Sequence, residues 1–423
     1  MIYYGHGSEN TSISHEELKK ALSDALGKLG PRRKILVVPP DFTRYHSRAG
    51  LITELIWEYY GSAISDILPA LGTHYPMSEA EISTMFGKVP QSLFREHNWR
   101  KDIVTLGEVP AEFVRKVSEN RVDFSWPAQV NKLLVEGKFD LILSVGQVVP
   151  HEVIGMANYN KNIFVGTGGK EGINKSHFLG AAYGMERIMG RADNPVRQVL
   201  NYASENFASH LPIVYIHSVI GHSDDGEMVM KGLFIGDNSE SFNKAAALSL
   251  KVNFELLANP LKKVVVYLDP HEFKSTWLGN KSIYRTRMAL DDYGELIVLA
   301  PGVKEFGEDK EIDRLIRKYG YRTTPEILEL VRNNQELRDN LSAAAHLIHG
   351  SHENRFRVTY CPGKLSKQEI ESVNFSYGEP DKMMKKYDPS KLKDGFNMVN
   401  GEEIFYISNP ALGLWASKDR FNQ

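Results

Sequence analysis

Short apolar runs alternate with amphipathic stretches along the first half of the chain. The apolar runs cover residues 35–38, 66–71, 138–145, 212–216 and 228–234. Between the first two runs, residues 51–63 place apolar side chains at three-and-four spacing, which is typical of a helix that packs one face on a sheet. A strand, a helix and a second strand form a parallel pair, because parallel strands need a crossover connection. The pattern therefore predicts an α/β fold.

Local signals set the limits of these elements. Ser14 and Glu17 predict a capping box that starts a helix running to about Leu29. Asn259-Pro260 follows a helical stretch and marks a boundary. Beyond it, the sequence predicts a second α/β unit, with strands at 263–268, 295–300 and 357–360 and a long helical stretch over 324–345.

We therefore predict two α/β domains with mostly parallel sheets around a central cleft, where a ligand is expected to bind. The N-terminal catalytic domain covers residues 1–260, and the C-terminal domain covers 261–402. The tail, residues 403–423, is expected to pack back on the first domain.

Composition narrows the classes of function. The 423 residues include 51 basic and 53 acidic side chains, so no charge excess favours nucleic acid or an anionic membrane surface. The single cysteine, Cys361, excludes an intrachain disulfide and a multi-cysteine metal cage. No stretch approaches the ~20 apolar residues of a membrane span, and no signal peptide is evident. We expect a cytoplasmic protein whose partner is a small molecule.

Polar residues follow three of the predicted strands. Asp41 and Arg44 come after the first, His74 after the second and His151 after the third. Because the carboxyl ends of parallel strands share one edge of a sheet, these residues can meet in one crevice. His74 and His151 are the candidate acid/base catalysts, since imidazole exchanges protons near neutral pH. The alternatives are that each histidine has no role and that Asp41 and Arg44 form a helix cap with a local ion pair.

A glycine-rich, cationic stretch follows His151. Gly168, Gly169, Lys170 and Lys175 could bind a phosphate or carboxylate through backbone amides and ammonium groups. The stretch approaches the phosphate-binding P-loop pattern, but Asn174 stands where the second glycine belongs.

In the second predicted domain, Tyr284, Arg285 and Arg287 form a candidate substrate site. Arginine binds carboxylates with two parallel hydrogen bonds, so this segment could clamp an acidic substrate. The alternative is a solvated basic segment without a ligand.

The order of these motifs resembles the lactate racemase family, whose members use a nickel-pincer nucleotide. Asp41-Phe-Thr-Arg44 is similar to the family's Asp-His-Thr-Arg turn, and Gly72-Thr-His74-Tyr-Pro76 to its Gly-Phe-His-Arg-Pro. The strand before His151 and the segment Lys175-Ser-His-Phe-Leu-Gly180 also fall in the family's order. No single motif is specific to the family, but the order of the motifs along the first two thirds of the chain is specific to it.

The resemblance implies an isomerase, a racemase or epimerase that inverts C2 of a 2-hydroxy acid by hydride transfer to and from the nucleotide. It implies that His74 and His151 are the two acid/bases, and that Asp41 and Arg44 line the cofactor site. Lys175 corresponds to the lysine that tethers the cofactor, with Lys170 as a rival because the preceding loop is longer than in the family. Recombinant protein could lack this cofactor.

Two departures from the family pattern bear on the metal and the substrate. The nickel-binding histidine has no counterpart in the aligned region 185–191, and His177 is the nearest substitute. Arg285 and Arg287 stand where the family has glutamine and lysine, so we expect a substrate larger or more polar than lactate.

Two other functions remain open at this point. One is a nucleotide-binding phosphotransferase that uses the Lys175-Ser176 loop, and the other is a noncatalytic two-lobe protein that binds an anion. Which acid is turned over and how many subunits assemble are left open.

Overall fold

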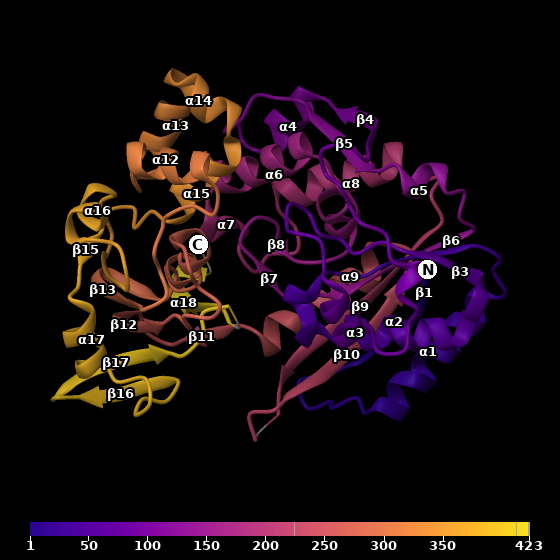
Figure 1. Ribbon diagram of the computed structural model, residues 1–423, viewed down its shortest axis with the longest axis horizontal. Coiled ribbons are helices and arrows are strands. Elements are labelled where there is room, and N and C mark those ends of the chain that lie inside the picture. The colour runs from indigo at the N-terminus through magenta and orange to yellow at the C-terminus, as the bar shows by residue number, and fades with distance from the viewer. Residues whose placement is uncertain (224, 412, 422–423) are drawn as a thin grey trace. The chain divides into compact units, whose positions relative to one another are not determined.

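The computed structural model describes residues 1–223, 225–411 and 413–421, and its chain divides into two compact units. Unit 1 comprises residues 1–176 and 189–253, and unit 2 comprises residues 177–188 and 254–423. Both units combine helices with a six-stranded sheet, as predicted (Figure 1). The chain thus crosses between the units three times, which the sequence did not indicate.

The sheet of unit 1 is parallel in its centre and antiparallel at one end. Its strands, in spatial order, are β1 (Ile2–Gly7), β10 (Met228–Gly236), β9 (Ile213–His222), β6 (Leu141–Gln147), β2 (Ile35–Val38) and β3 (Ile64–Ile67). The pairs β9 with β6, β6 with β2 and β2 with β3 are parallel. From β2 the chain first adds β3 on one side and later β6 on the other. The strand order therefore reverses between β2 and β6, and ligands of open α/β sheets bind in the crevice at such a point.

Helices cover this sheet by burying one apolar face each. Helix α1 (His15–Leu29) begins with the predicted capping box between Ser14 and Glu17, and its inner face contributes six buried residues to the core. Helix α9 (Ser239–Val252) packs on β9 and β10, and α2 (Ala49–Tyr60) packs on β6. The other elements of unit 1 are η1 (Phe42–Ser47), η2 (Gly61–Ala63), α3 (Glu79–Phe86), η3 (Gln91–Leu93), β4 (Ile103–Val109), α4 (Ala111–Val117), β5 (Trp126–Asn131), α5 (Leu133–Glu136), β7 (Pro150–His151), β8 (Gly155–Met156), η4 (Asn162–Gly166) and α8 (Pro195–Phe207).

The sheet of unit 2 is parallel except at one edge. Its order is β15 (Ser376–Tyr377), β14 (Arg357–Pro362), β13 (Leu290–Ala300), β12 (Leu261–Tyr267), β17 (Glu402–Ile407) and β16 (Gly395–Val399), with only β16 antiparallel to its neighbour. Its helices are α10 (Thr276–Gly279), α11 (Lys281–Tyr284), α12 (Lys310–Tyr319), α16 (Lys367–Ser372), α17 (Pro380–Lys386) and α18 (Lys418–Phe421), with α7 (Met185–Ile188) from the inserted segment. Helix α6 (Lys170–Tyr183) begins in unit 1 and ends in unit 2.

The long helix expected over 324–345 is three helices instead. They are α13 (Thr324–Asn333), α14 (Gln335–Asp339) and α15 (Leu341–His349). Asn334 and Asn340 separate them with non-helical backbone, and the Asn340 side chain accepts a hydrogen bond from the backbone N–H of Ala343. Asparagine favours such a break, because its side chain competes with the helix for backbone hydrogen bonds.

The predicted return of the tail to the first domain is wrong. Residues 403–423 belong to unit 2, where β17 pairs with β12 and β18 (Trp415–Ser417) pairs with β11 (Glu255–Leu257). The pairing of β17 covers the edge of β12, whose backbone groups would otherwise lie open to other strands. Leu412 and residues 422–423 of this tail lie outside the described residues.

No helix in the described ranges is both long and apolar enough to cross a membrane.

Candidate functional site

Asp41 and His74 form a hydrogen-bonded pair beyond the ends of β2 and β3. Asp41 caps η1 by accepting the backbone N–H of Thr43 at 3.0 Å, and it is 5% exposed. The imidazole Nδ1 of His74 lies 2.6 Å from Asp41 Oδ2, and the His74 side chain is 59% exposed. Burial alone would raise the pKa of Asp41, but the hydrogen bonds from His74 and Thr43 outweigh burial and hold this pKa below its ordinary value. An ionised Asp41 accepts the Nδ1 proton, so neutral His74 carries its lone pair on Nε2.

His151 lies in β7, beyond the end of β6, and has a different environment. It is 8% exposed, and its Nδ1 accepts the backbone N–H of Val153 at 3.1 Å. The carboxylate of Glu152 lies 3.9 Å from the same nitrogen. Because Nδ1 acts as an acceptor, neutral His151 carries its proton on Nε2.

Lys161, which the sequence reading missed, connects the surroundings of the two histidines. It is partly buried, and burial together with the nearby Arg44 lowers its pKa to about 8. The carboxylates of Asp41 and Glu152 act in the opposite direction. Asp41 bonds to His74 and Glu152 lies beside His151, so charges from both histidine neighbourhoods act on this one ammonium group.

Asn162 fixes the position of Lys161 at the reversal of strand order. Its Nδ2 donates to Val38 O at 3.0 Å at the end of β2, and to Ser144 Oγ at 3.1 Å and Val145 O at 3.4 Å in β6. The turn before His74 is joined to the same segment, since Gly72 N donates to Gly166 O at 2.8 Å. The alternation of Asn158, Asn160 and Asn162 around Lys161 was a signal in the sequence, because buried asparagines must each find partners.

Arg44 is the second cation of this region. Its side chain is half-buried, and its backbone leaves the helical range inside η1. Among the described residues, neither the Arg44 guanidinium nor the Lys161 ammonium makes a hydrogen bond or ion pair within the chain. Two cations without partners at a strand-order reversal form a site suited to an anionic ligand.

The glycine-rich stretch is packed against the protein. Gly168 and Gly169 are buried, and the carbonyl of Gly168 lies 3.1 Å from Nε2 of the buried His97. A Cβ at Gly168 would lie 1.9 Å from Phe164 O, and one at Gly169 would lie 2.5 Å from Gln129 Oε1. Close packing therefore explains these glycines, and the predicted cofactor role is not needed to account for them.

Lys170 and Lys175 lie in helix α6, whose bounds rule out a phosphate-binding loop at this segment. Lys170 is exposed at the first position of the helix. Lys175 Nζ donates to Ser125 O at 2.8 Å and to Glu171 Oε1 at 2.6 Å. The lysine of a P-loop instead stands where a glycine-rich loop enters the helix, so Lys175, in the second turn of α6, does not occupy the position that the phosphotransferase alternative needs.

The remaining predicted residues belong to unit 2. They are His177, Tyr284, Arg285 and Arg287. His177 is partly buried in α6, Tyr284 packs edge-on against His349, and Arg285 Nη1 donates to Gly413 O at 3.5 Å.

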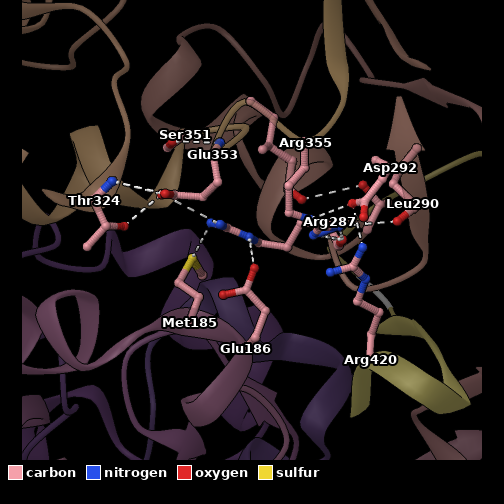
Figure 2. Close-up of polar contacts among 12 residues, drawn as sticks. Met185, Glu186, Arg287, Leu290, Asp292, Thr324, Ser351, Glu353, Arg355 and Arg420 are labelled. Atoms are coloured by element: carbon pink, nitrogen blue, oxygen red, sulfur yellow. Dashed lines mark hydrogen bonds and ion pairs between the residues drawn. The ribbon is translucent and has the colours of Figure 1, made fainter. Parts of the chain in front are cut away.

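Arg287 is committed to a network within unit 2 (Figure 2). Its side chain is 3% exposed, its Nε donates to Glu186 Oε1 at 2.7 Å, and its Nη2 lies 3.8 Å from Glu353 Oε1. Glu353 also accepts the backbone N–H of Thr324. The guanidinium of Arg287 holds the inserted α7 segment, and the substrate role predicted for Arg287 stays a prediction.

No cluster of three or more metal-binding side chains occurs in residues 1–223, 225–411 and 413–421.

The fold and the strand-end residues define an α/β protein with a candidate anion site in unit 1. Residues 6–187 match the model of the lactate racemase N-terminal domain. Residues 6–187 are therefore similar to the lactate racemase N-terminal domain, which agrees with the family resemblance expected from the sequence.

Solved structures share the fold. A protein from Thermotoga maritima is 24% identical with a TM-score of 0.81, covering 98% of this chain and all of that one. The lactate racemase apoprotein from Thermoanaerobacterium thermosaccharolyticum is 17% identical with a TM-score of 0.70, covering 96% of this chain and 93% of that one. No curated protein matches the chain.

Proposed function

We propose that the protein is a racemase or epimerase of 2-hydroxy acids, with its reaction site in unit 1 at the reversal between β2 and β6. The observation that carries the proposal is the placement of Lys161. Charges beside both candidate histidines act on its ammonium group, and Asn162 ties it to the ends of both strands. The N-terminal family match supports the reaction class.

In this proposal, the two histidines move the hydroxyl proton. Inversion at C2 passes through a planar 2-keto acid, so one group takes the hydroxyl proton of the substrate and another returns a proton to the product. His74 is suited to take it, since Asp41 orients its ring and stabilises the imidazolium that forms. His151 is suited to return a proton in its protonated form, because the imidazolium is the form of histidine that gives up a proton near neutral pH.

Lys161 replaces Lys175 as the proposed tether. Lys175 is held by Glu171 and by the carbonyl of Ser125. Lys161 has no such partner in the described chain, and its pKa of about 8 leaves part of it as a neutral amine near pH 7.5. A neutral amine is the nucleophilic form of lysine.

The residues of unit 1 fit an anionic mononucleotide cofactor. Arg44 and Lys161 would hold its negative groups, and Asp41 would line the same region through His74. When bound, the nickel-pincer nucleotide supplies a hydride acceptor and most of its own metal donors.

We keep a substrate larger or more polar than lactate as the expectation, because the predicted contacts Arg285 and Arg287 offer more hydrogen-bond donors than the glutamine and lysine of the family pattern. We also infer a cytoplasmic location and no nucleic acid or membrane partner.

The test uses the full chain produced together with the enzymes that build the cofactor. Chiral chromatography follows lactate and a set of longer and dicarboxylic 2-hydroxy acids, each supplied as one enantiomer or epimer. We expect inversion of at least one acid, with nickel bound and a mass increase on the Lys161 peptide. Lys161→Met should lose the added mass, whereas the matched Lys175→Met should keep it. Nickel-loaded protein that inverts no acid contradicts the proposed reaction.

A further inference from the structure

Arg197 is a buried cation in unit 1 that the proposed chemistry does not use. It lies on α8, is 2% exposed, and makes no ion pair with any described residue. Its guanidinium stands over the ring of Phe242, 4.4 Å from the centroid. Burial lowers the pKa of Arg197 to about 9. A buried charge without an opposite charge is costly, so its place in the fold calls for an explanation.

The hydrogen-bond partners of the Arg197 guanidinium lie in the segment that leads to Lys161. Its Nη2 donates to Met156 O at 2.6 Å, and its Nη1 donates to Asn158 O at 3.3 Å and to Asn160 Oδ1. The planar fork of arginine suits such converging oxygens, since it offers five donors in a fixed geometry. One side chain therefore ties together alternate residues of a single loop.

This loop needs support, because part of its backbone is strained. Asn158 and Tyr159 have φ values of 66° and 59°, in the left-handed region that is unfavourable for a residue such as tyrosine. On the other sides, Asn158 donates to Gly146 O at 2.7 Å and Asn160 donates to Asn201 Oδ1 at 2.7 Å. Arg197 is the only charged member of the described set of contacts that holds the segment.

Arg197 also acts on Lys161 through its charge. Four charged groups influence the Lys161 ammonium: Arg44 and Arg197 disfavour its protonated form, and Asp41 and Glu152 favour it. The same arginine thus supports the backbone that carries Lys161 and opposes a positive charge on it.

We propose that Arg197 is a positioning residue that fixes the Lys161 segment and keeps the Lys161 side chain available as a neutral amine. The inference rests on the proposed role of Lys161 and adds a residue that supports this role, beside burial and Arg44.

The test is competitive labelling of the cofactor-free full chain with acetic anhydride between pH 6 and 11. Peptide mass spectrometry reads the modified fraction at Lys161 and at the exposed Lys170. For the wild-type protein we expect a midpoint at Lys161 near pH 8. In Arg197→Met, loss of the charge and of the loop contacts should raise this midpoint. A rise of one pKa unit lowers the labelling rate at pH 7.5 by about eightfold. Arg197→Lys, which keeps the charge without the fork, should give a smaller decrease.

Controls separate this role from general stability. Circular dichroism and the thermal midpoint show which variants are folded at the labelling temperature, and labelling of Lys170 should not change. The matched control is Arg100→Met, which removes an exposed arginine that stacks on Trp99 in the same unit. Folded Arg197→Met with the wild-type profile at Lys161 would overturn the proposal.

A second variant covers the case in which Arg197→Met does not fold. Asn160→Asp keeps the shape of the side chain and gives Arg197 the carboxylate that it lacks. We expect this variant to fold and to label more slowly at Lys161 at pH 7.5, because the cation is neutralised; an unchanged rate contradicts the proposal. No substrate or cofactor enters the assay, so a failure of the racemase proposal and a failure of this one are told apart.

Discussion

The two candidate catalytic histidines lie in contrasting environments. His74 is more than half exposed, and its Nδ1 meets the carboxylate of Asp41 at 2.6 Å. His151 is buried, and its Nδ1 accepts the backbone N–H of Val153 at 3.1 Å. A carboxylate stabilises the imidazolium form, whereas a backbone N–H that donates to the ring stabilises the neutral form. The comparison teaches that the same residue type, placed after two strands of one sheet, is prepared for opposite proton movements.

The contrast has a consequence for turnover. When one histidine has taken a proton and the other has given one, the pair must exchange protons before the next cycle in the same direction. The following predictions test the contrast between the two histidines.

The largest expected effect is the loss of either histidine. His74→Gln and His151→Gln should each lower the rate of C2 inversion in loaded protein by about 10²–10⁴-fold, the range of general acid/base catalysis. Chiral analysis of initial rates measures it. The matched control is His271→Gln, which changes an exposed histidine of unit 2 outside the proposed site. Full activity in either site variant would remove that histidine from the mechanism.

Asp41→Asn should have a smaller effect, because it leaves both imidazoles in place. The loss of a charge-assisted hydrogen bond, worth roughly 1.5–3 kcal/mol, corresponds to roughly 10–100-fold in rate. Because solvent screens the exposed His74 ring, we expect a decrease in rate near the lower end of this range. Rate measurements across pH check it, and a variant as active as the wild type would show that His74 needs no carboxylate.

The stability of the protein in acid should also depend on Asp41. Its pKa is lower in the folded chain than its ordinary value, so its contribution is complete above that ordinary value and is lost as the pH falls through the folded pKa. Urea unfolding between pH 2 and 7 should therefore show a flatter profile for Asp41→Asn, by about 1 kcal/mol after allowance for the exposure of His74. An unchanged slope would indicate that the Asp41–His74 contact contributes little.

The smallest expected effect is a difference between the NMR signals of the two histidine rings. Nitrogen-15 NMR of the neutral rings should show the proton of His74 on Nδ1 and that of His151 on Nε2. Assignment uses the two glutamine variants, each of which removes one set of signals. If both rings carried their proton on the same nitrogen, the proposed difference between His74 and His151 would be contradicted.

Much of the fold followed from the sequence. The capping box at Ser14 and the strands after it are local features, and the residues beyond β2 and β3 did meet, since Asp41 and His74 bond to each other. Strand polarity alone supports that kind of prediction.

Long-range partners set the limit of prediction. From the sequence, Arg287 was predicted to bind a carboxylate of the substrate. In the structure its Nε donates to Glu186, which lies 101 residues earlier in the chain. The sequence around Lys161 matches no strand pattern and no known motif. Its position depends on Asn162, which bonds to two different strands. The passage of residues 177–188 into unit 2 likewise depends on tertiary packing and leaves no local pattern.

The most direct measurement supplies loaded protein with one enantiomer of a 2-hydroxy acid that carries deuterium at C2, in ordinary water. Our account predicts product of inverted configuration that keeps deuterium at C2, with only the hydroxyl proton exchanged through His74 and His151. Inverted product that carries hydrogen from the solvent at C2 would contradict it, because the histidines would then be moving the carbon-bound hydrogen as a proton.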